Sequence, residues 1–534
     1  MQNRWLALLH GQLPRSKRLA KLRRAWGAPG DNDAWRASAY FDLTCGAATP
    51  QLVDDKTWLD LEFPKIFSAI DTTITAIGRQ YLFKQLRTFE YDTETLSRRQ
   101  EAYDVLRTNS ALRERLQLSL QRLHADSATY IVELLYGPPP AKPRRHALVV
   151  PWVLLTVLVT VGAIVHWVPL WLCGSILAVN AIGALIFSPK LDLNAEALTS
   201  CGRLLEVAER IASLQRKKSD LSYAAQLVAE TAKRRRLKSQ LQSLKVLDRL
   251  RSVDILGGII ILVNGCFLLK LALYTRSIDQ FIRHRAEWES TFELVGAIDA
   301  SIAIANFHHR FPDRCRPRIC SDQVIDIQNG YHPLLAAPVK NSIALGKESA
   351  LVTGSNMAGK TTFIKMVAIN IILGHTIGTC LADSATIPRS RVMALIRGDQ
   401  SVASGKSRYF AEAEGIRDFV AESARGECGV FVIDEPFSGT NTVERVAAAA
   451  AVLAAISLHA QALVTTHDVE LQHLLNDRFR LFHFQEDPAV EGFFDYHLRA
   501  GAGTQRNAIR VLERLGFPSD IIARALALVA ATGG

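Results

Sequence analysis

The chain has 534 residues, of which 49% are hydrophobic and 22% charged. This composition excludes an intrinsically disordered protein, and the length predicts several domains rather than one core. Sixty-three Lys and Arg against 52 Asp and Glu give a net charge of +11. That excess suits nucleic acid, an anionic membrane face or simply a solvated basic surface. The cysteines form no CxxC pair, which indicates a reducing compartment.

Residues 1–50 form a basic N-terminal arm, for which the sequence leaves two interpretations open. The arm contacts phosphates or a membrane surface, or it is a solvated helix. Residues 51–145 follow as the first part of a helical core, because apolar residues recur there at helical spacing and glycines are few. The charge of the arm is concentrated in Arg15, Lys17, Arg18, Lys21, Arg23 and Arg24.

An uncharged stretch interrupts this helical region. Between Arg145 and Lys190 there is no Asp, Glu, Lys or Arg. Its two apolar halves, Ala147–Val165 and Leu170–Phe187, each approach the roughly 20 residues that one membrane crossing needs. The sequence therefore predicts a transmembrane helical hairpin over 146–189, with basic flanks that place both ends in the cytoplasm. A buried pair of helices in a soluble core is the alternative.

Residues 190–320 are predicted to be the second part of the helical core and lever. A basic cluster at Lys233–Lys238 is either a phosphate contact or a solvated helix face. A second apolar run, Ile255–Leu269, is short for a membrane span. We expect it to be a buried helix, with a membrane-embedded role as the alternative.

From residue 321 to residue 534, short apolar strands alternate with helices, which predicts a parallel α/β domain. A strand at Ala350–Thr353 and a helix at Phe363–Leu373 flank a match to the phosphate-loop pattern. Glycines let such a loop turn its amides toward phosphate oxygens, and the helix N-terminus adds a favourable dipole. The predicted nucleotide-binding residues are Gly354, Ser355, Asn356, Met357, Ala358, Gly359, Lys360, Thr361 and Thr362.

Polar residues follow two further apolar strands. Asp434 and Glu435 end the strand Gly429–Ile433. Asp434, together with the Thr361 hydroxyl, is expected to hold Mg²⁺, while Glu435 activates the attacking water. His467 ends another strand and is predicted to position that water or to sense the terminal phosphate. The predicted cofactors are therefore ATP and Mg²⁺.

The motifs together resemble the MutS family of DNA mismatch repair ATPases. The resemblance covers roughly residues 325–525 and includes an Asn-Met pair inside the phosphate loop. It also includes an acidic motif followed by a Gly-Thr turn and a Thr-His-x-x-Glu-Leu segment. The segments that carry it are Asn329–Leu334, Thr353–Thr362, Ser404–Glu412, Asp434–Thr440, Thr466–Leu471 and Tyr496–Pro518.

The resemblance implies an ATPase that works as a homodimer with shared nucleotide sites, in which Ser407 of one chain reaches the nucleotide of the other. It also implies DNA as a candidate partner. The sequence departs from the family in the hairpin, and only about fifty residues precede the core, so no N-terminal mismatch-reading domain is expected. The alternatives are an ATPase subunit that energises a membrane process and a nucleotide-gated membrane scaffold without DNA binding.

The sequence therefore predicts a multidomain protein. An α-helical core and lever region carries an inserted transmembrane hairpin and is followed by an α/β P-loop ATPase domain of the ABC type, similar to MutS. We expect it at the cytoplasmic membrane, attached through residues 147–187, with the ATPase domain and both termini in the cytoplasm.

Overall fold

A computed structural model of the chain divides into two compact units. The first comprises residues 1–48, 68–84 and 98–310, and the second comprises 49–67, 85–97 and 311–534. The division falls within three helices, α5 (Phe63–Ile70), α6 (Ala76–Arg87) and α7 (Thr93–Thr108). The structure describes residues 14–30, 36–45, 51–123, 130–138, 146–215, 263, 265–355, 357–396, 408–426, 428–486, 494–503 and 516–532.

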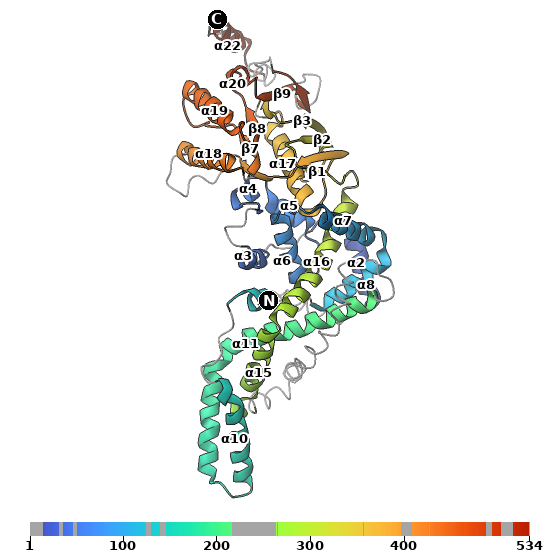
Figure 1. Cartoon of the computed structure of the whole chain (residues 1–534), viewed down its shortest axis with the longest axis vertical. Coiled ribbons are helices and arrows are strands. Elements are labelled where there is room, and N and C mark those ends of the chain that lie inside the picture. Colours follow the sequence, from blue (N-terminus) through green and yellow to red (C-terminus); the bar gives the residue numbers. More distant parts are fainter. Residues whose placement is uncertain are drawn as a thin grey trace. The chain divides into compact units, whose positions relative to one another are not determined.

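The described part of the first unit is helical (Figure 1). Its two longest described helices are α11 and α16, which pack against each other. The described helices that lie wholly in this unit are α2 (Arg15–Ala25), α3 (Ala39–Thr44), α8 (Ser110–Leu120), the 3₁₀ turn η1 (Gln121–Leu123), α9 (Ile131–Tyr136), α10 (His146–Ile164), α11 (Leu170–Gln215), α15 (Leu269–Arg283) and α16 (Arg285–Arg310).

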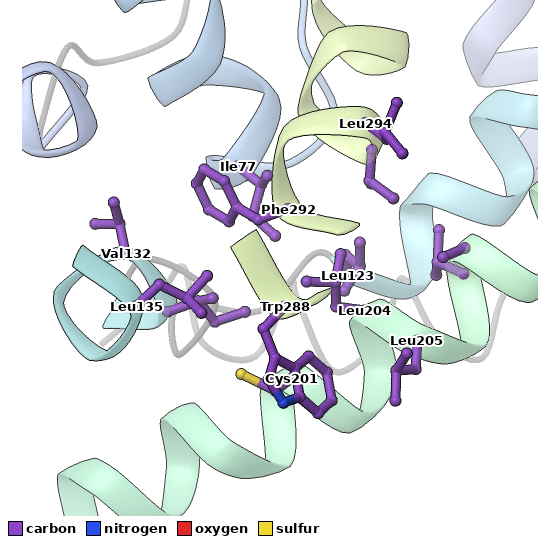
Figure 2. Packing of buried hydrophobic residues seen from close by; sticks show 14 of the residues in the cluster. Ile77, Leu123, Val132, Leu135, Cys201, Leu204, Leu205, Trp288, Phe292 and Leu294 are labelled. Atoms are coloured by element: carbon purple, nitrogen blue, oxygen red, sulfur yellow. The ribbon is translucent and has the colours of Figure 1, made fainter. Parts of the chain in front are cut away.

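Apolar side chains from distant parts of the chain form the core of this unit. On α16, Trp288 lies beside Cys201 of α11 and Phe292 lies beside Ile77 of α6, as Figure 2 shows. These four residues and Leu204 of α11 are each at most 1% exposed. Residues three or four apart share one face of a helix. The spacing of these pairs therefore explains why both helices bury a continuous apolar stripe here.

A buried carboxylate joins α6 to α16. Asp299 Oδ2 accepts hydrogen bonds from the Thr75 amide (2.8 Å) and hydroxyl (2.7 Å). Position 78 requires glycine, because a Cβ there would lie 2.3 Å from Asp299 Oδ2. Burial raises the pKa of Asp299 to about 6, although the bonds from Thr75 favour the ionised form. Asp299 thus satisfies amides at the start of α6 that have no partner within the helix.

The uncharged stretch forms α10 and the first part of α11, which pack together. Between them Trp152 Nε1 donates a hydrogen bond to Asn180 Oδ1 (2.7 Å), and Asn180 Nδ2 donates to Thr156 Oγ1 (3.2 Å). Large apolar side chains such as Leu158 remain exposed on α10.

The predicted transmembrane hairpin over 146–189 is wrong. Among the described residues, no helix has both the length and the apolar character that a membrane crossing requires. The uncharged stretch is not a pair of isolated spans, because α11 continues without a break through Lys190 to Gln215. Its second half packs Leu198 and Ile211 into the core. The predicted attachment to the cytoplasmic membrane through 147–187 depended on that hairpin and is wrong with it.

The described strands of the second unit form two sheets. The larger has the order β10-β9-β4-β8-β7-β6, and all its neighbours are parallel except β10 and β9. Its strands are β4 (Ser349–Thr353), β6 (Arg391–Leu395), β7 (Cys428–Asp434), β8 (Gln461–Thr466), β9 (Phe479–Glu486) and β10 (Phe494–Ala500).

The smaller sheet has the order β1-β5-β2-β3 and mixes parallel and antiparallel pairs. Its strands are β1 (Arg318–Cys320), β2 (Ile325–Gly330), β3 (Asn341–Leu345) and β5 (Ser384–Pro388). The described helices that lie wholly in the second unit are α4 (Asp55–Asp60), α17 (Lys360–Ile377), α18 (Arg408–Arg425), α19 (Thr442–Ile456), α20 (Glu470–Leu474) and α22 (Ser519–Thr532).

Helix α17 contacts strands of both sheets, including β2, β5, β7 and β8. It is buried along nearly its whole length, which its run of apolar residues permits. Helices α18 and α19 pack on the larger sheet and meet Phe431 and Val464 in a second apolar core (Figure 1).

Candidate functional site

Three neighbouring parallel strands end at one edge of the larger sheet. Strand β8 lies between β4 and β7, so that Thr353 pairs with Thr466 and Thr465 pairs with Asp434. The segments that follow the three strands therefore meet at this edge, where parallel α/β sheets bind ligands.

The loop after β4 turns at two glycines with positive φ. Gly354 has φ 136° and Gly359 has φ 95°, a region that side chains disfavour. A Cβ on Gly354 would lie 2.8 Å from the Phe484 carbonyl oxygen. Helix α17 begins at Lys360 directly after this turn. Its first amides have no partner within the helix and form, with the loop, a cradle that suits phosphate oxygens.

Lys360, Glu435 and His467 come together beside the loop. Lys360 Nζ donates a hydrogen bond to the Gly354 carbonyl oxygen (2.5 Å) and lies 3.6 Å from Glu435 Oε1. His467 Nδ1 lies 2.8 Å from the same carboxylate oxygen. The side chains of Lys360 and Glu435 are 2% and 8% exposed, whereas that of His467 is 42% exposed. The histidine thus lies between a buried carboxylate and solvent.

Thr361 and Asp434 form the second pair at this edge. Thr361 Oγ1 donates a hydrogen bond to Asp434 Oδ1 (2.9 Å), and the Thr465 hydroxyl donates to the same oxygen. Asp434 is 8% exposed. A hydroxyl and a carboxylate oxygen are the hard donors that Mg²⁺ prefers. The residues present therefore fit a magnesium ion next to the phosphate cradle.

The turn after β7 has an unusual backbone. Glu435 and Phe437 have φ values of 48° and 60°, which cost free energy in residues other than glycine and persist only where neighbouring structure enforces them. The Glu435 amide donates to the Thr465 carbonyl oxygen (3.0 Å). The Phe437 amide donates to the carboxylate of Glu412 on α18.

Helix α18 also contacts this turn through Tyr409. The rings of Tyr409 and Phe437 lie 6.1 Å apart, and a Cβ on Gly439 would lie 3.3 Å from Tyr409 Cβ. The contacts of Tyr409 and Glu412 thus connect the first turns of α18 to the backbone that carries Glu435.

Arg445 is a site neighbour that sequence reasoning missed. It lies on α19 and forms a two-pronged ion pair with Asp468, with Nε–Oδ2 at 2.9 Å and Nη2–Oδ1 at 2.5 Å. Asp468 directly follows His467, so this pair fixes the turn that presents the histidine. The partners are 23 positions apart, and no local pattern joins them.

The structure brings together most of the predicted site residues. Gly354, Gly359, Lys360, Thr361, Asp434, Glu435 and His467 meet at one edge. Ser355 and Ala358 close the loop through a backbone hydrogen bond (3.2 Å), and Thr362 lies in the first turn of α17. Met357 is 76% exposed. Asn356, Ser407 and the basic cluster Lys233–Lys238 lie outside the described residues, as does most of the apolar run Ile255–Leu269.

Comparison with known proteins gives matches over this part of the chain. Residues 350–532 match the family model of MutS domain V. A DNA mismatch repair protein MutS from Chloroflexus aurantiacus is 31% identical over 280 residues, which cover 49% of this chain and 28% of that protein.

Two further proteins of the same name are similar to this chain. The one from Thermus thermophilus is 29% identical over 258 residues, covering 47% of this chain and 31% of that protein. The one from Natronomonas pharaonis is 28% identical over 249 residues, covering 44% and 29%. The chain thus spans less than a third of the length of these curated relatives, and the matches support a relation to the MutS family.

Proposed function

We propose that this chain binds and hydrolyses ATP at the edge formed by β4, β8 and β7, and that it uses this reaction while acting on DNA. One observation carries the ATPase proposal. A phosphate cradle, a hydroxyl–carboxylate pair that fits Mg²⁺ and a buried carboxylate beside a histidine converge at one sheet edge.

Binding rests on the loop and on Lys360. The amides around Gly359 would face phosphate oxygens, and the Lys360 ammonium would neutralise charge on the β- and γ-phosphates. Thr361 and Asp434 would hold Mg²⁺, which when bound supplies a positive charge that offsets the charge of the phosphate oxygens. Lys360 Nζ already contacts the Gly354 carbonyl oxygen and the Glu435 carboxylate, which hold it beside the loop.

Hydrolysis rests on Glu435. Its carboxylate would accept a proton from a water molecule as the water oxygen attacks the γ-phosphorus and the bond to the β,γ-bridging oxygen breaks. ADP and inorganic phosphate leave. His467, whose Nδ1 lies 2.8 Å from Glu435 Oε1 and whose side chain is 42% exposed, would orient that water and the carboxylate.

The action on DNA and the dimer are proposed from the matched relatives and the resemblance. The relatives are named as DNA mismatch repair proteins, and the net charge of +11 suits a polyanion. Ser407 immediately precedes α18, whose first turns contact the Glu435 turn. If Ser407 reaches the nucleotide of a partner chain, the segment that carries it is also connected, through α18, to the Glu435 turn of its own chain. Steady-state phosphate release with and without duplex DNA tests the proposal.

Glu412 is expected to position the Glu435 turn. Glu412→Ala removes the acceptor of the Phe437 amide, so we expect turnover to fall by about 10- to 10²-fold, since a hydrogen bond to a charged group contributes roughly 1.5–3 kcal/mol. ATP affinity should change little, because the expected effect acts through the turn that carries Glu435. Phosphate release and nucleotide titration measure the two effects separately.

Two variants control this prediction. Glu412→Gln keeps an acceptor oxygen and should retain most of the turnover, while Glu414→Gln changes a neighbouring acid on α18 and should have no effect. Equal turnover in Glu412→Ala and the unmodified chain would refute the positioning role. Equal losses of turnover and ATP affinity would instead indicate a general loss of structure.

A further inference from the structure

Helix α2 carries a stripe of basic residues on its outer face. Lys17, Lys21 and Arg24 are spaced by four and three positions, so they lie on one side of the helix. All three are exposed, whereas Leu19 and Leu22 are partly buried. The helix has no acidic residue between Arg15 and Ala25.

Helix α2 is held in a fixed orientation within the first unit. Arg23 makes a two-pronged ion pair with Glu114 of α8, with distances of 2.7 and 2.9 Å. Just beyond the helix, the Arg113 guanidinium lies 3.6 Å from the centroid of the Trp26 ring, and the Gly27 amide donates to Asn306 Oδ1 (2.7 Å). These contacts hold the opposite side of the helix against the first unit, so the basic stripe faces outward.

Two further arginines extend the stripe beyond α2. Arg122 of η1 and Arg210 of α11 are both exposed. Burial and the nearby charges of Arg210 and Arg18 lower the pKa of Arg122, while Glu206 opposes this effect. Helix α8 contacts α2, η1 and α11, so these arginines come from elements that pack around one helix. Among the described residues, no hydrogen-bond partner satisfies the buried Nε of Arg18.

We propose that Lys17, Lys21 and Arg24, continued by Arg18, Arg122 and Arg210, form a surface that contacts the phosphate backbone of duplex DNA. These six residues are called the α2 basic surface below. The proposal rests on the proposed action on DNA and names where the contact is made. Clustered like charges repel one another, so a polyanion that neutralises them binds favourably and releases its counterions.

A lipid surface suits this face less well. Helices that lie in a membrane interface insert large apolar side chains next to their basic residues. The exposed residues of α2 are basic apart from the small residues Ser16, Ala20 and Ala25, because its leucines turn toward the protein. A backbone of phosphates needs no such insertion, and the stripe from Lys17 to Arg24 extends for about 10 Å along the helix.

The test is the triple variant Lys17→Gln, Lys21→Gln and Arg24→Gln in the full chain. Glutamine has nearly the helix propensity of lysine and arginine, so α2 should persist. Each lost phosphate contact removes about 0.9 from the slope of log K against log salt concentration. We therefore expect the slope to fall by about 2.7, and the affinity for duplex DNA at about 0.1 M salt to fall by roughly 10²-fold or more.

The matched control removes the same charge from exposed arginines that lie outside the α2 basic surface. Arg417, Arg425 and Arg478 pair with Asp418, Glu422 and Asp477, and their replacement by Gln should leave the salt slope unchanged. ATP turnover without DNA should be the same in both triple variants. That readout separates this proposal from the ATPase.

Three results would overturn the assignment. If the unmodified chain binds DNA and the α2 variant binds it equally well, the surface is wrong while the action on DNA survives. If the unmodified chain binds no duplex DNA, both proposals fail. If the α2 variant keeps its DNA affinity but loses binding to vesicles of phosphatidylcholine and phosphatidylserine, the surface recognises lipid instead.

Discussion

Glu435→Gln is expected to lower ATP turnover by roughly 10²–10⁴-fold, which is the usual contribution of a general base. The exchange keeps the size of the side chain and the contact with His467 Nδ1, but an amide cannot accept the proton of the attacking water. Glu435 is 7% exposed and its amide is held by Thr465. The loss should therefore be chemical rather than structural, and single-turnover phosphate release measures it.

Binding should survive this exchange. The cradle around Gly359 and Lys360 remains, so titration with ATP is expected to give an affinity close to that of the unmodified chain. Glu444→Gln, an exposed acid on α19, is the control and should turn over normally. Unchanged turnover in Glu435→Gln would remove Glu435 from the reaction.

Lys360→Ala is expected to weaken ATP binding by about 10- to 10²-fold, because a hydrogen bond between charged groups contributes roughly 1.5–3 kcal/mol. Lys360 is almost fully buried, and its ammonium lies 3.6 Å from the Glu435 carboxylate. Removing the ammonium also leaves the Glu435 charge facing the phosphates. Isothermal titration with ATP measures the loss, and the exposed Lys347→Ala serves as control. An unaltered ATP affinity would reject the phosphate-loop assignment.

The same variant tests the shared nucleotide sites. A Lys360→Ala chain mixed with a Ser407→Ala chain forms a dimer in which one site has both defects and the other has none. Partial recovery of turnover is then expected, although each variant alone is impaired. Mixed dimers that form but recover no activity would contradict shared sites and indicate that Ser407 serves only its own chain, for example as a cap of α18.

The local structure of the nucleotide site could be predicted from sequence because each part has a local pattern. The apolar run before Gly354 forms the strand Ser349–Thr353, and the helix predicted at Phe363–Leu373 extends from Lys360 to Ile377. Strand β7 likewise ends at Asp434. The strand order could not be read in the same way. The contacts of Glu412 and Arg445 join residues 25 and 23 positions apart, and no periodicity encodes them.

The smaller sheet and the uncharged stretch show where local patterns fail. Strands β1, β2, β3 and β5 are short, and their pairing joins residues as far apart as Arg318 and Thr386. In the uncharged stretch, the absence of charge describes composition but not where a helix ends. Helix α11 continues to Gln215 because its second half finds an apolar core.

We propose that the edge formed by β4, β8 and β7 hydrolyses ATP and that this reaction is coupled to DNA binding. The most direct measurement is the rate of phosphate release by the full chain with ATP and Mg²⁺, with and without duplex DNA, beside Glu435→Gln. We expect hydrolysis that Glu435→Gln slows by roughly 10²–10⁴-fold, and a rate that changes when DNA is added. Phosphate release no faster than that of Glu435→Gln would contradict the ATPase, and a rate unaffected by saturating DNA would contradict its coupling to DNA.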